Sequence, residues 1–215
     1  MATTVETPPE PLSGRRSQAA RNDQRILEAA RTVFTADPEA PISMVAERAG
    51  VGISALYRRY RSKEELLQRL SLDGLRRYIA AAEAALADEG DPWLAFTQFM
   101  RRCVDDGAGS LTVRFVGRFT AAEELHTLGR IASEATQRLI ERVQAADALR
   151  ADIVVADLSL ILEQLQSIQV ADERHASQLR HRYLALALDA LHLSSAQPLP
   201  GPPPRWEEIS GRYTV

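Results

Sequence analysis

The chain has 215 residues, of which 45% are hydrophobic and 26% are charged, and its formal net charge is −3. This length is enough to bury one large or two small helical cores, while the negative balance argues against a protein that coats nucleic acid with its whole surface. The single cysteine excludes an intramolecular disulfide, and no apolar run reaches the roughly 20 residues of a membrane span, so we expect a cytoplasmic protein.

Charge is distributed unevenly along the chain. Residues 1–63 contain ten basic and seven acidic side chains, a balance of +3, and the net charge of −3 therefore leaves −6 for the remainder. A basic amino-terminal part on an acidic remainder favours local binding of phosphate groups.

The first predicted helix follows a polar amino-terminal segment. Residues 1–20 are small, polar and proline-rich, and we expect a disordered arm. Its Arg15 and Arg16 suit either entry into a DNA minor groove or a solvated tail. A helix is predicted from about Asn22 to Ala36, with a buried stripe formed by Ile26, Ala29, Ala30, Val33 and Phe34.

Residues 42–67 are predicted to form a helix, a tight turn, a second short helix and the start of a third. Apolar residues recur at helical spacing from Ile42 to Ala49, and Gly50 permits the positive φ at which that helix ends. The second helix directs Leu56 and Tyr60 inward at positions i and i+4. This architecture is typical of a helix-turn-helix DNA reader, although a helical hairpin that only packs a core has the same pattern.

The segment AERAGVGISALYRRYRSKEELL resembles the DNA-binding part of the tetracycline-repressor (TetR) family, which commonly has the pattern A-G-V-x-x-x-T-L-Y-x-H-F-x-[SN]-K-[ED]-x-L-L. The matching residues fall in register without a gap: Ala49-Gly50-Val51, Leu56-Tyr57, Tyr60 for the family's Phe, and Ser62-Lys63-Glu64. The resemblance implies an all-α protein of about nine helices. It implies a helix-turn-helix domain over 21–68 and a helical ligand-binding and dimerisation domain over 69–194. Composition adds the disordered arm over 1–20 and a proline-rich tail over 195–215.

The resemblance also implies which residues contact DNA: Ser43, Gly52, Ile53, Ser54, Ala55, Tyr57, Arg58, Arg59 and Lys63. Tyr57 and Lys63 match the family's phosphate contacts. Arg58 occupies a position that often meets bases, where it can bind guanine through two hydrogen bonds. Ala55 replaces the common Thr, and Arg59 replaces the usual His and keeps a phosphate contact.

The remainder of the chain is expected to form the ligand-binding body. A long helix from Ser62 to about Leu86 links it to the helix-turn-helix domain, which we call the head, and another helix starts near Pro92. The resemblance implies a small-molecule pocket between the helices after Pro92, and we expect it to be lined by Trp93, Phe96, Phe99, Met100, Cys103, Phe115 and Phe119. Few charged groups accompany these residues, so an apolar effector is expected. The alternative is that they are ordinary core.

A helix is then expected over about 121–148. A second helix is expected to be capped by Asp152, and a last helix is expected after Asp172. The last two are apolar on more than one face, which favours a two-fold four-helix contact between two chains. The resemblance agrees with such a homodimer, and we expect its contacts to come from Val154, Leu158, Ile161, Leu165, Tyr183 and Leu186. The alternative is a helix pair buried inside one chain. In the tail, Trp206 and Ile209 either dock on the body or remain free.

No arrangement of residues indicates catalysis, a metal or a cofactor. The sequence Gly50-Val51-Gly52-Ile53-Ser54-Ala55 matches a dinucleotide fingerprint only formally, because it follows a helix and no strand. The four histidines lack the pairing of a zinc site. We therefore expect no enzymatic activity. The resemblance implies a ligand-responsive repressor that binds a palindromic operator as a dimer; a helical sensing or scaffold protein that does not read DNA is the alternative.

Overall fold

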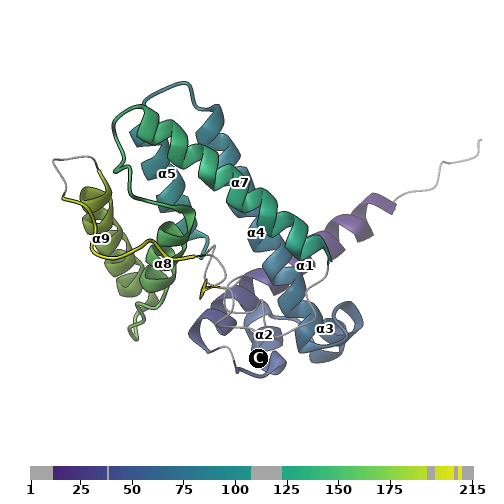
Figure 1. Cartoon of the computed structure of the whole chain (residues 1–215). Helices are drawn as coiled ribbons and strands as arrows, with labels where there is room; N and C mark the ends of the chain where they lie inside the picture. Colours follow the sequence, from purple (N-terminus) through teal and green to yellow (C-terminus); the bar gives the residue numbers. More distant parts are fainter. Residues whose placement is uncertain (1–11, 38, 108–122, 193–196, 206–207, 210–215) are drawn as a thin grey trace, which may run out of the picture. The chain divides into compact units, whose positions relative to one another are not determined.

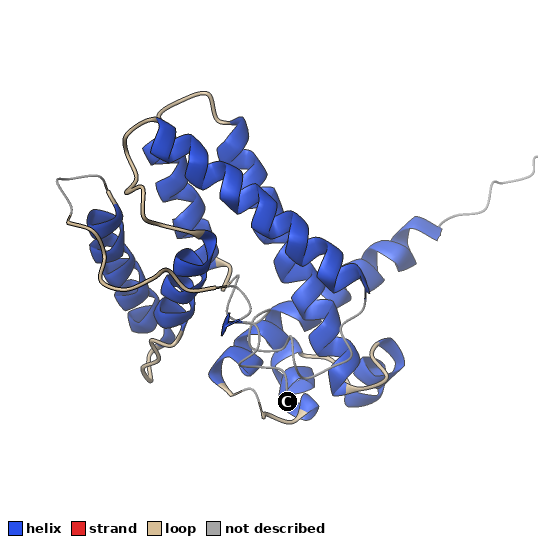
Figure 2. Ribbon diagram, viewed as in Figure 1, coloured by secondary structure: helices blue, strands red, loops and turns tan. Residues whose placement is uncertain are grey.

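The chain folds into helices joined by loops. The computed structural model describes residues 12–37, 39–107, 123–192, 197–205 and 208–209, with side chains from residue 21 onward. In these ranges the helices are α1 (Leu12–Ala36), α2 (Ile42–Ala49), α3 (Ile53–Arg59), α4 (Lys63–Ala87), α5 (Pro92–Asp105), α7 (Glu123–Ala145), α8 (Val155–Gln166) and α9 (Glu173–Leu191) (Figure 1). The described trace contains helices and loops but no strand (Figure 2). The predicted all-α class is confirmed, with eight helices in the described residues.

The chain divides into two compact units, residues 1–62 and residues 63–215. We call them the N-terminal unit and the C-terminal unit. The division falls at the start of α4, so the predicted head over residues 21–68 includes the first turns of a helix that belongs to the second unit. The reason is that α4 is continuous over Lys63–Ala87 and packs along α7 and α5.

Helix α1 begins earlier than its sequence pattern predicted. We expected a start near Asn22 after a disordered arm, but α1 begins at Leu12, so residues 12–20 of that arm are helical. The apolar stripe that guided the prediction starts at Ile26, which is also the first buried residue among the α1 side chains that the structure describes. Ala30 and Phe34 are fully covered, and α1 packs against α2.

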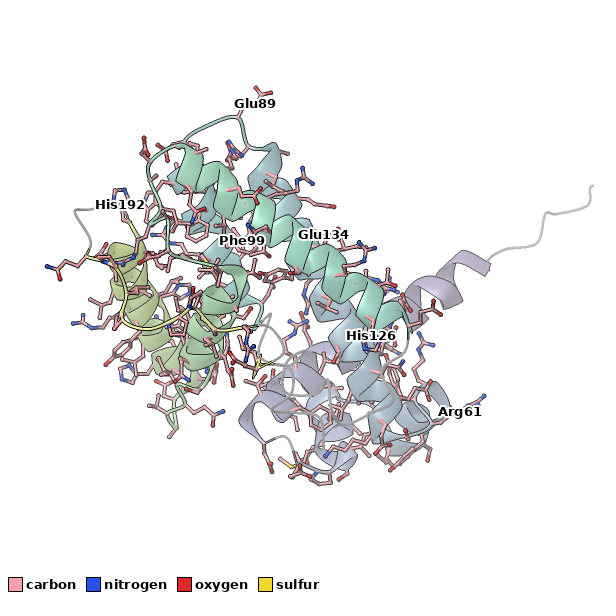
Figure 3. The ribbon with its side chains drawn as sticks, in the orientation of Figure 1. Arg61, Glu89, Phe99, His126, Glu134 and His192 are labelled. Atoms are coloured by element: carbon pink, nitrogen blue, oxygen red, sulfur yellow. The ribbon has the colours of Figure 1, made fainter. Side chains whose placement is uncertain are left out.

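The C-terminal unit is built on α4, α5 and α7. Its core contains Phe96, Phe99 and Met100 of α5 together with Leu139 and Val143 of α7. Figure 3 shows Phe99 among these helices, whereas Glu89 and Glu134 lie on the outside.

The carboxyl end of α4 is held by an arginine of α7. Arg142 donates hydrogen bonds from Nη1 to the carbonyl oxygens of Ala85, at 2.8 Å, and Leu86, at 3.0 Å. These contacts satisfy carbonyl groups that have no partner within α4 itself.

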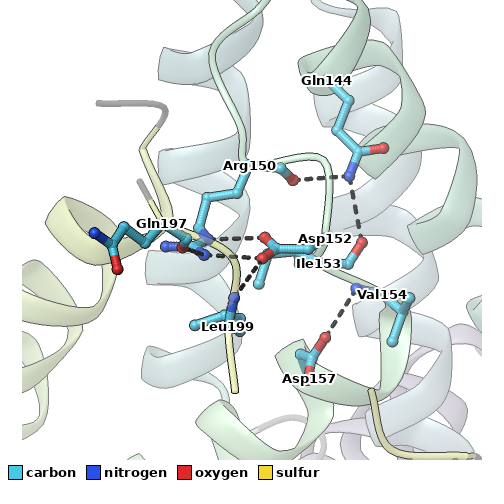
Figure 4. Close-up of polar contacts among 8 residues, drawn as sticks. All are labelled: Gln144, Arg150, Asp152, Ile153, Val154, Asp157, Gln197 and Leu199. Atoms are coloured by element: carbon cyan, nitrogen blue, oxygen red, sulfur yellow. Dashed lines mark hydrogen bonds and ion pairs between the residues drawn. The ribbon is translucent and has the colours of Figure 1, made fainter. Parts of the chain in front are cut away.

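Helix α8 starts differently from the prediction. We expected Asp152 to cap it, but α8 begins at Val155, and Asp157 accepts a hydrogen bond from the Val154 amide at 2.9 Å. Asp152 is bound instead by Arg150 and by the amide of Leu199 (Figure 4). Arg150 also donates to the carbonyl of Gln197 at 2.8 Å. The first part of the tail is therefore docked on the loop between α7 and α8, and Ile209 near its end is buried.

Candidate nucleic-acid interface

The turn between α2 and α3 contains two glycines, of which Gly50 has the conformation that requires glycine. Gly50 ends α2 in the left-handed region at φ 63°, and its amide donates to α2 carbonyls. A Cβ at Gly50 would lie 2.9 Å from Nη2 of Arg25. That same nitrogen donates a hydrogen bond of 2.7 Å to the carbonyl oxygen of Ala49. Gly52 precedes α3 in an extended conformation, and a Cβ there would meet no atom within 4 Å. The predicted helix, turn and helix are confirmed.

Helix α3 has one buried and one exposed face. Leu56 is fully buried and Tyr60 is 3% exposed, whereas Tyr57 is 49% exposed. Among the other predicted DNA contacts, Ser43, Gly52, Ile53, Ser54, Arg58 and Arg59 are exposed, and Ala55 is half-buried. The face that we predicted to meet DNA is therefore open to solvent within this unit. Arg61, just beyond α3, is exposed as well (Figure 3).

Arg59 is not a free cation on this face. Its Nε and Nη2 donate to the two carboxylate oxygens of Asp23 at 2.8 and 2.9 Å. The Tyr60 hydroxyl donates to Asp23 Oδ1 at 2.5 Å. Asp23 and Arg25 were not predicted as residues of the site. Nothing in their spacing indicates that two charged residues at the start of the apolar stripe in α1 reach α3 and α2.

Lys63 is the first residue of α4 and is half-buried. Glu64 and Glu65 follow it in the first helical turn, where acidic side chains interact favourably with the helix dipole. A lysine at this end is unfavourable for the helix dipole unless an anion lies near it, and its binding of an anion from outside the chain stays a prediction.

The predicted ligand-pocket residues lie mostly in the core of the C-terminal unit. Phe96, Phe99, Met100 and Cys103 are buried, Trp93 is half-buried, and Phe115 and Phe119 lie outside the described residues. The Tyr78 ring packs edge-on against Phe99 at 5.2 Å, and its hydroxyl lies 2.8 Å from Oγ1 of Thr136.

Burial raises the pKa of both the Tyr78 hydroxyl and the Cys103 thiol well above their ordinary values. Both groups therefore remain protonated at neutral pH, and the thiol is not activated as a nucleophile.

The predicted dimer contacts separate into three groups by exposure. Leu158 and Leu165 are buried in the core of their own unit, so they are not available to a second chain, and this part of the prediction needs correction. Val154 and Ile161 are half-buried. Tyr183 and Leu186 of α9 are 51% and 57% exposed, and they remain the candidates for a contact outside the chain. The seam pattern could not separate burial within one chain from burial between two.

The described part of the chain lacks two other kinds of feature. They contain no group of three or more His, Cys, Asp or Glu side chains arranged to hold a metal ion. None of the described helices is long and apolar enough to cross a membrane.

Comparisons with known families match both parts of the chain. Residues 26–70 match the family described as bacterial regulatory proteins, tetR family. Residues 91–193 match the family described as transcriptional regulator SbtR-like, C-terminal domain. No curated protein matches the chain significantly.

Solved structures of TetR regulators share the fold. The regulator SCO0520 from Streptomyces coelicolor is 24% identical with a TM-score of 0.57, over 80% of this chain and 99% of that one. A regulator from Mycobacterium vanbaalenii is 28% identical with a TM-score of 0.56, over 83% and 99%. LfrR from Mycobacterium smegmatis, solved in complex with proflavine, is 22% identical with a TM-score of 0.57, over 84% and 99%.

Proposed function

Because the chain belongs to the TetR family of bacterial regulatory proteins and is a DNA-binding transcriptional regulator, we propose that it is a repressor. In this proposal a homodimer binds a palindromic operator through the two copies of α3, and a small-molecule effector releases it. The observation that carries the proposal is the exposed face of α3, where Tyr57 and Arg58 are open to solvent while Leu56 and Tyr60 anchor the helix from the other side.

The exposed residues of α3 suit different parts of a duplex. Arg58 presents a guanidinium that fits the O6 and N7 acceptors of guanine in the major groove. Ile53 and the methyl group of Ala55 suit the thymine methyl, and Ser54 adds a hydroxyl for either base or phosphate. Gly52 leaves room for close approach of the backbone, since nothing occupies the space beside it. Base contacts of this kind would select the operator sequence.

Phosphate contacts would set the position of α3 on the duplex without reading its sequence. Tyr57, on the exposed face of α3, and Lys63, at the start of α4, are the proposed phosphate contacts. Ser43, exposed near the start of α2, is a further candidate.

A homodimer would place two heads on successive turns of one DNA face, with centres about 34–36 Å apart, which requires a palindromic operator. The proposed contact uses α9, where Tyr183 and Leu186 expose large apolar surface three residues apart on one helical face. Exposed apolar side chains that cluster in this way are typical of interfaces between proteins.

The proposed effector is apolar. The candidate lining is built from Phe96, Phe99, Met100 and Cys103 with Trp93 beside them, and none of these side chains carries a charge. An effector acts only if it binds the arrangement that is unable to bind DNA more tightly, with couplings of about 1–3 kcal/mol. Helix α4 continues the chain directly from the N-terminal unit and packs on α5 and α7, so it is the proposed link.

A selection from random DNA duplexes with the purified full-length chain tests the proposal. Enrichment of a palindrome whose half-sites are separated by about one helical turn is the expected result. Failure to enrich any sequence would contradict specific DNA reading and favour a helical sensing or scaffold protein. Enrichment of a single half-site would retain DNA reading but contradict the dimeric mode.

A further inference from the structure

Helix α1 holds the helix-turn-helix at two points through residues only two apart. Arg25 reaches the last carbonyl of α2 at Ala49, and Asp23 reaches the end of α3 at Arg59 and Tyr60. Because positions i and i+2 of a helix point in different directions, the two side chains serve different helices. The contact from Asp23 matters for function, because α3 is the helix proposed to read DNA.

Helix α3 needs such support because it has only seven residues. Helices this short are unstable alone, since forming the first turn costs more than its few hydrogen bonds return. Within α3 only Leu56 is buried, and Tyr60 adds a second anchor just beyond its end. Contacts from outside α3 must therefore fix its position.

The carboxylate of Asp23 supplies such a contact. It accepts three hydrogen bonds, two from Arg59 in parallel and one from the Tyr60 hydroxyl. Two parallel bonds between a guanidinium and a carboxylate restrict geometry as well as adding energy. The side chain of Asp23 is only 14% exposed although that of Arg59 is 57% exposed, so the carboxylate is held more firmly than in an ordinary surface pair.

The same contact changes the role of Arg59. A phosphate oxygen would have to compete with a carboxylate that already compensates the charge of the guanidinium. We propose that Asp23 is a positioning residue for DNA readout, which with Arg59 and Tyr60 fixes the orientation of α3, and that Arg59 serves this contact and not a phosphate. This inference rests on the proposed DNA-reading function of α3.

Four variants of the full-length chain test it: Asp23→Asn, Arg59→Gln, the double variant, and the milder Tyr60→Phe. Glu28→Gln is the matched control, because it removes one acidic charge from an exposed position of α1. Amide hydrogen exchange of α3 is measured without DNA. Binding is measured over a range of salt concentrations to the duplex that wild type selects from a random pool and to a scrambled duplex.

Faster exchange of α3 is expected in both single variants and, less strongly, in Tyr60→Phe, with the control unchanged. The ratio of affinities for selected over scrambled duplex should fall about tenfold, which is the scale of losing a coupled, charge-assisted contact. The salt dependence should stay as in wild type, because no phosphate contact is lost. The double variant should lose no more of this affinity ratio than either single variant, because Asp23→Asn, Arg59→Gln and their combination all break one shared contact.

The opposite pattern would overturn the inference. If Arg59 contacts phosphate, Arg59→Gln should lower the affinity for both duplexes equally and reduce the salt slope by about one. Asp23→Asn should then raise the affinity for both duplexes. Unchanged exchange of α3 in Asp23→Asn and Arg59→Gln would overturn it without any use of DNA. Absence of binding by wild type to every duplex would instead defeat the proposed function. Thermal unfolding of each variant identifies any that fails to fold. In that case Tyr60→Phe, which removes only a hydroxyl, tests the inference through the exchange of α3 and the ratio of affinities.

Discussion

Individual residues of α3 divide by exposure, and the sequence predicts this division well. The i, i+4 spacing of Leu56 and Tyr60 assigns both to the inner face, and both are buried. The partner of Arg59 was not predictable, because Asp23 lies 36 positions away in the chain and only the fold brings the two together. Sequence spacing identifies the face of a side chain, whereas a contact between helices depends on tertiary structure.

The proposed phosphate contacts of Tyr57 and Lys63 predict a loss of DNA affinity that does not depend on the DNA sequence. The double variant Tyr57→Ala/Lys63→Ala should bind all duplexes more weakly, and the slope of log affinity against log salt should fall in magnitude by about one, for the lost lysine contact. Fluorescence anisotropy with two unrelated duplexes over a salt series measures both effects. Binding and salt slope equal to those of wild type would remove these residues from the interface.

The proposed reading of a base by Arg58 predicts a loss of sequence preference at one position instead. Arg58→Ala should lose about 1–3 kcal/mol of discrimination at one base pair of each half-site, because the alanine cannot donate two hydrogen bonds to guanine. Repeating the duplex selection with the variant measures the preference at every position. A uniform loss across all sequences would make Arg58 a phosphate contact.

At the scale of single elements, the end of α2 depends on the backbone conformation of Gly50. Gly50→Ala should destabilise the fold by about 1–2 kcal/mol, since a side chain is strained at φ 63° and its Cβ would approach Arg25 Nη2 to 2.9 Å. Gly52→Ala is the matched control, because φ there is −65° and the space beside it is open; we expect a cost of only a few tenths of a kcal/mol. Urea unfolding compares the two, and equal losses would contradict the account.

Helices were predicted best where their buried face repeats regularly. Helix α2 has the predicted bounds, and the long helix predicted from Ser62 to about Leu86 is observed as Lys63–Ala87. Two predictions failed where the decisive interaction is tertiary. Asp152 was expected to cap α8, but it binds Arg150 and the amide of Leu199, and Leu199 belongs to the tail. Leu158 and Leu165 fit a seam between two chains, but helices of their own chain cover them. Periodicity predicts that a face is buried, and it does not predict what buries it.

For the molecule as a whole, the docked tail makes part of the stability dependent on pH. Hydrogen bonds from Arg150 and from the amide of Leu199 hold the pKa of the Asp152 carboxyl well below its usual range. The ionised form is therefore favoured in the folded state. Its contribution to folding stability is complete above the ordinary carboxyl pKa of about 4 and is lost as the pH falls towards the pKa of the folded state.

Asp152→Asn should lower stability at neutral pH, and the difference from wild type should shrink in acid. Urea unfolding at several pH values tests this, with Glu89→Gln as the control for charge; a difference that stays constant from neutral to acid pH would contradict it.

In the proposed function, assembly of two chains is the step that places two DNA-binding units on a palindrome, and the exposed pair Tyr183 and Leu186 on α9 provides its test. Leu186→Asp places a charge where an apolar contact is proposed, and it should raise the dimer dissociation constant at least about tenfold. Leu94→Asp makes the same change at another exposed leucine, on α5, and should leave dimerisation unchanged. Sedimentation velocity over a concentration series distinguishes the two variants. A monomeric variant should retain the fold and the half-site preference of α3 but lose tight binding to the full operator, because the second head no longer binds as part of the same molecule. Equal effects of the two leucine substitutions would instead place the contact between chains away from α9.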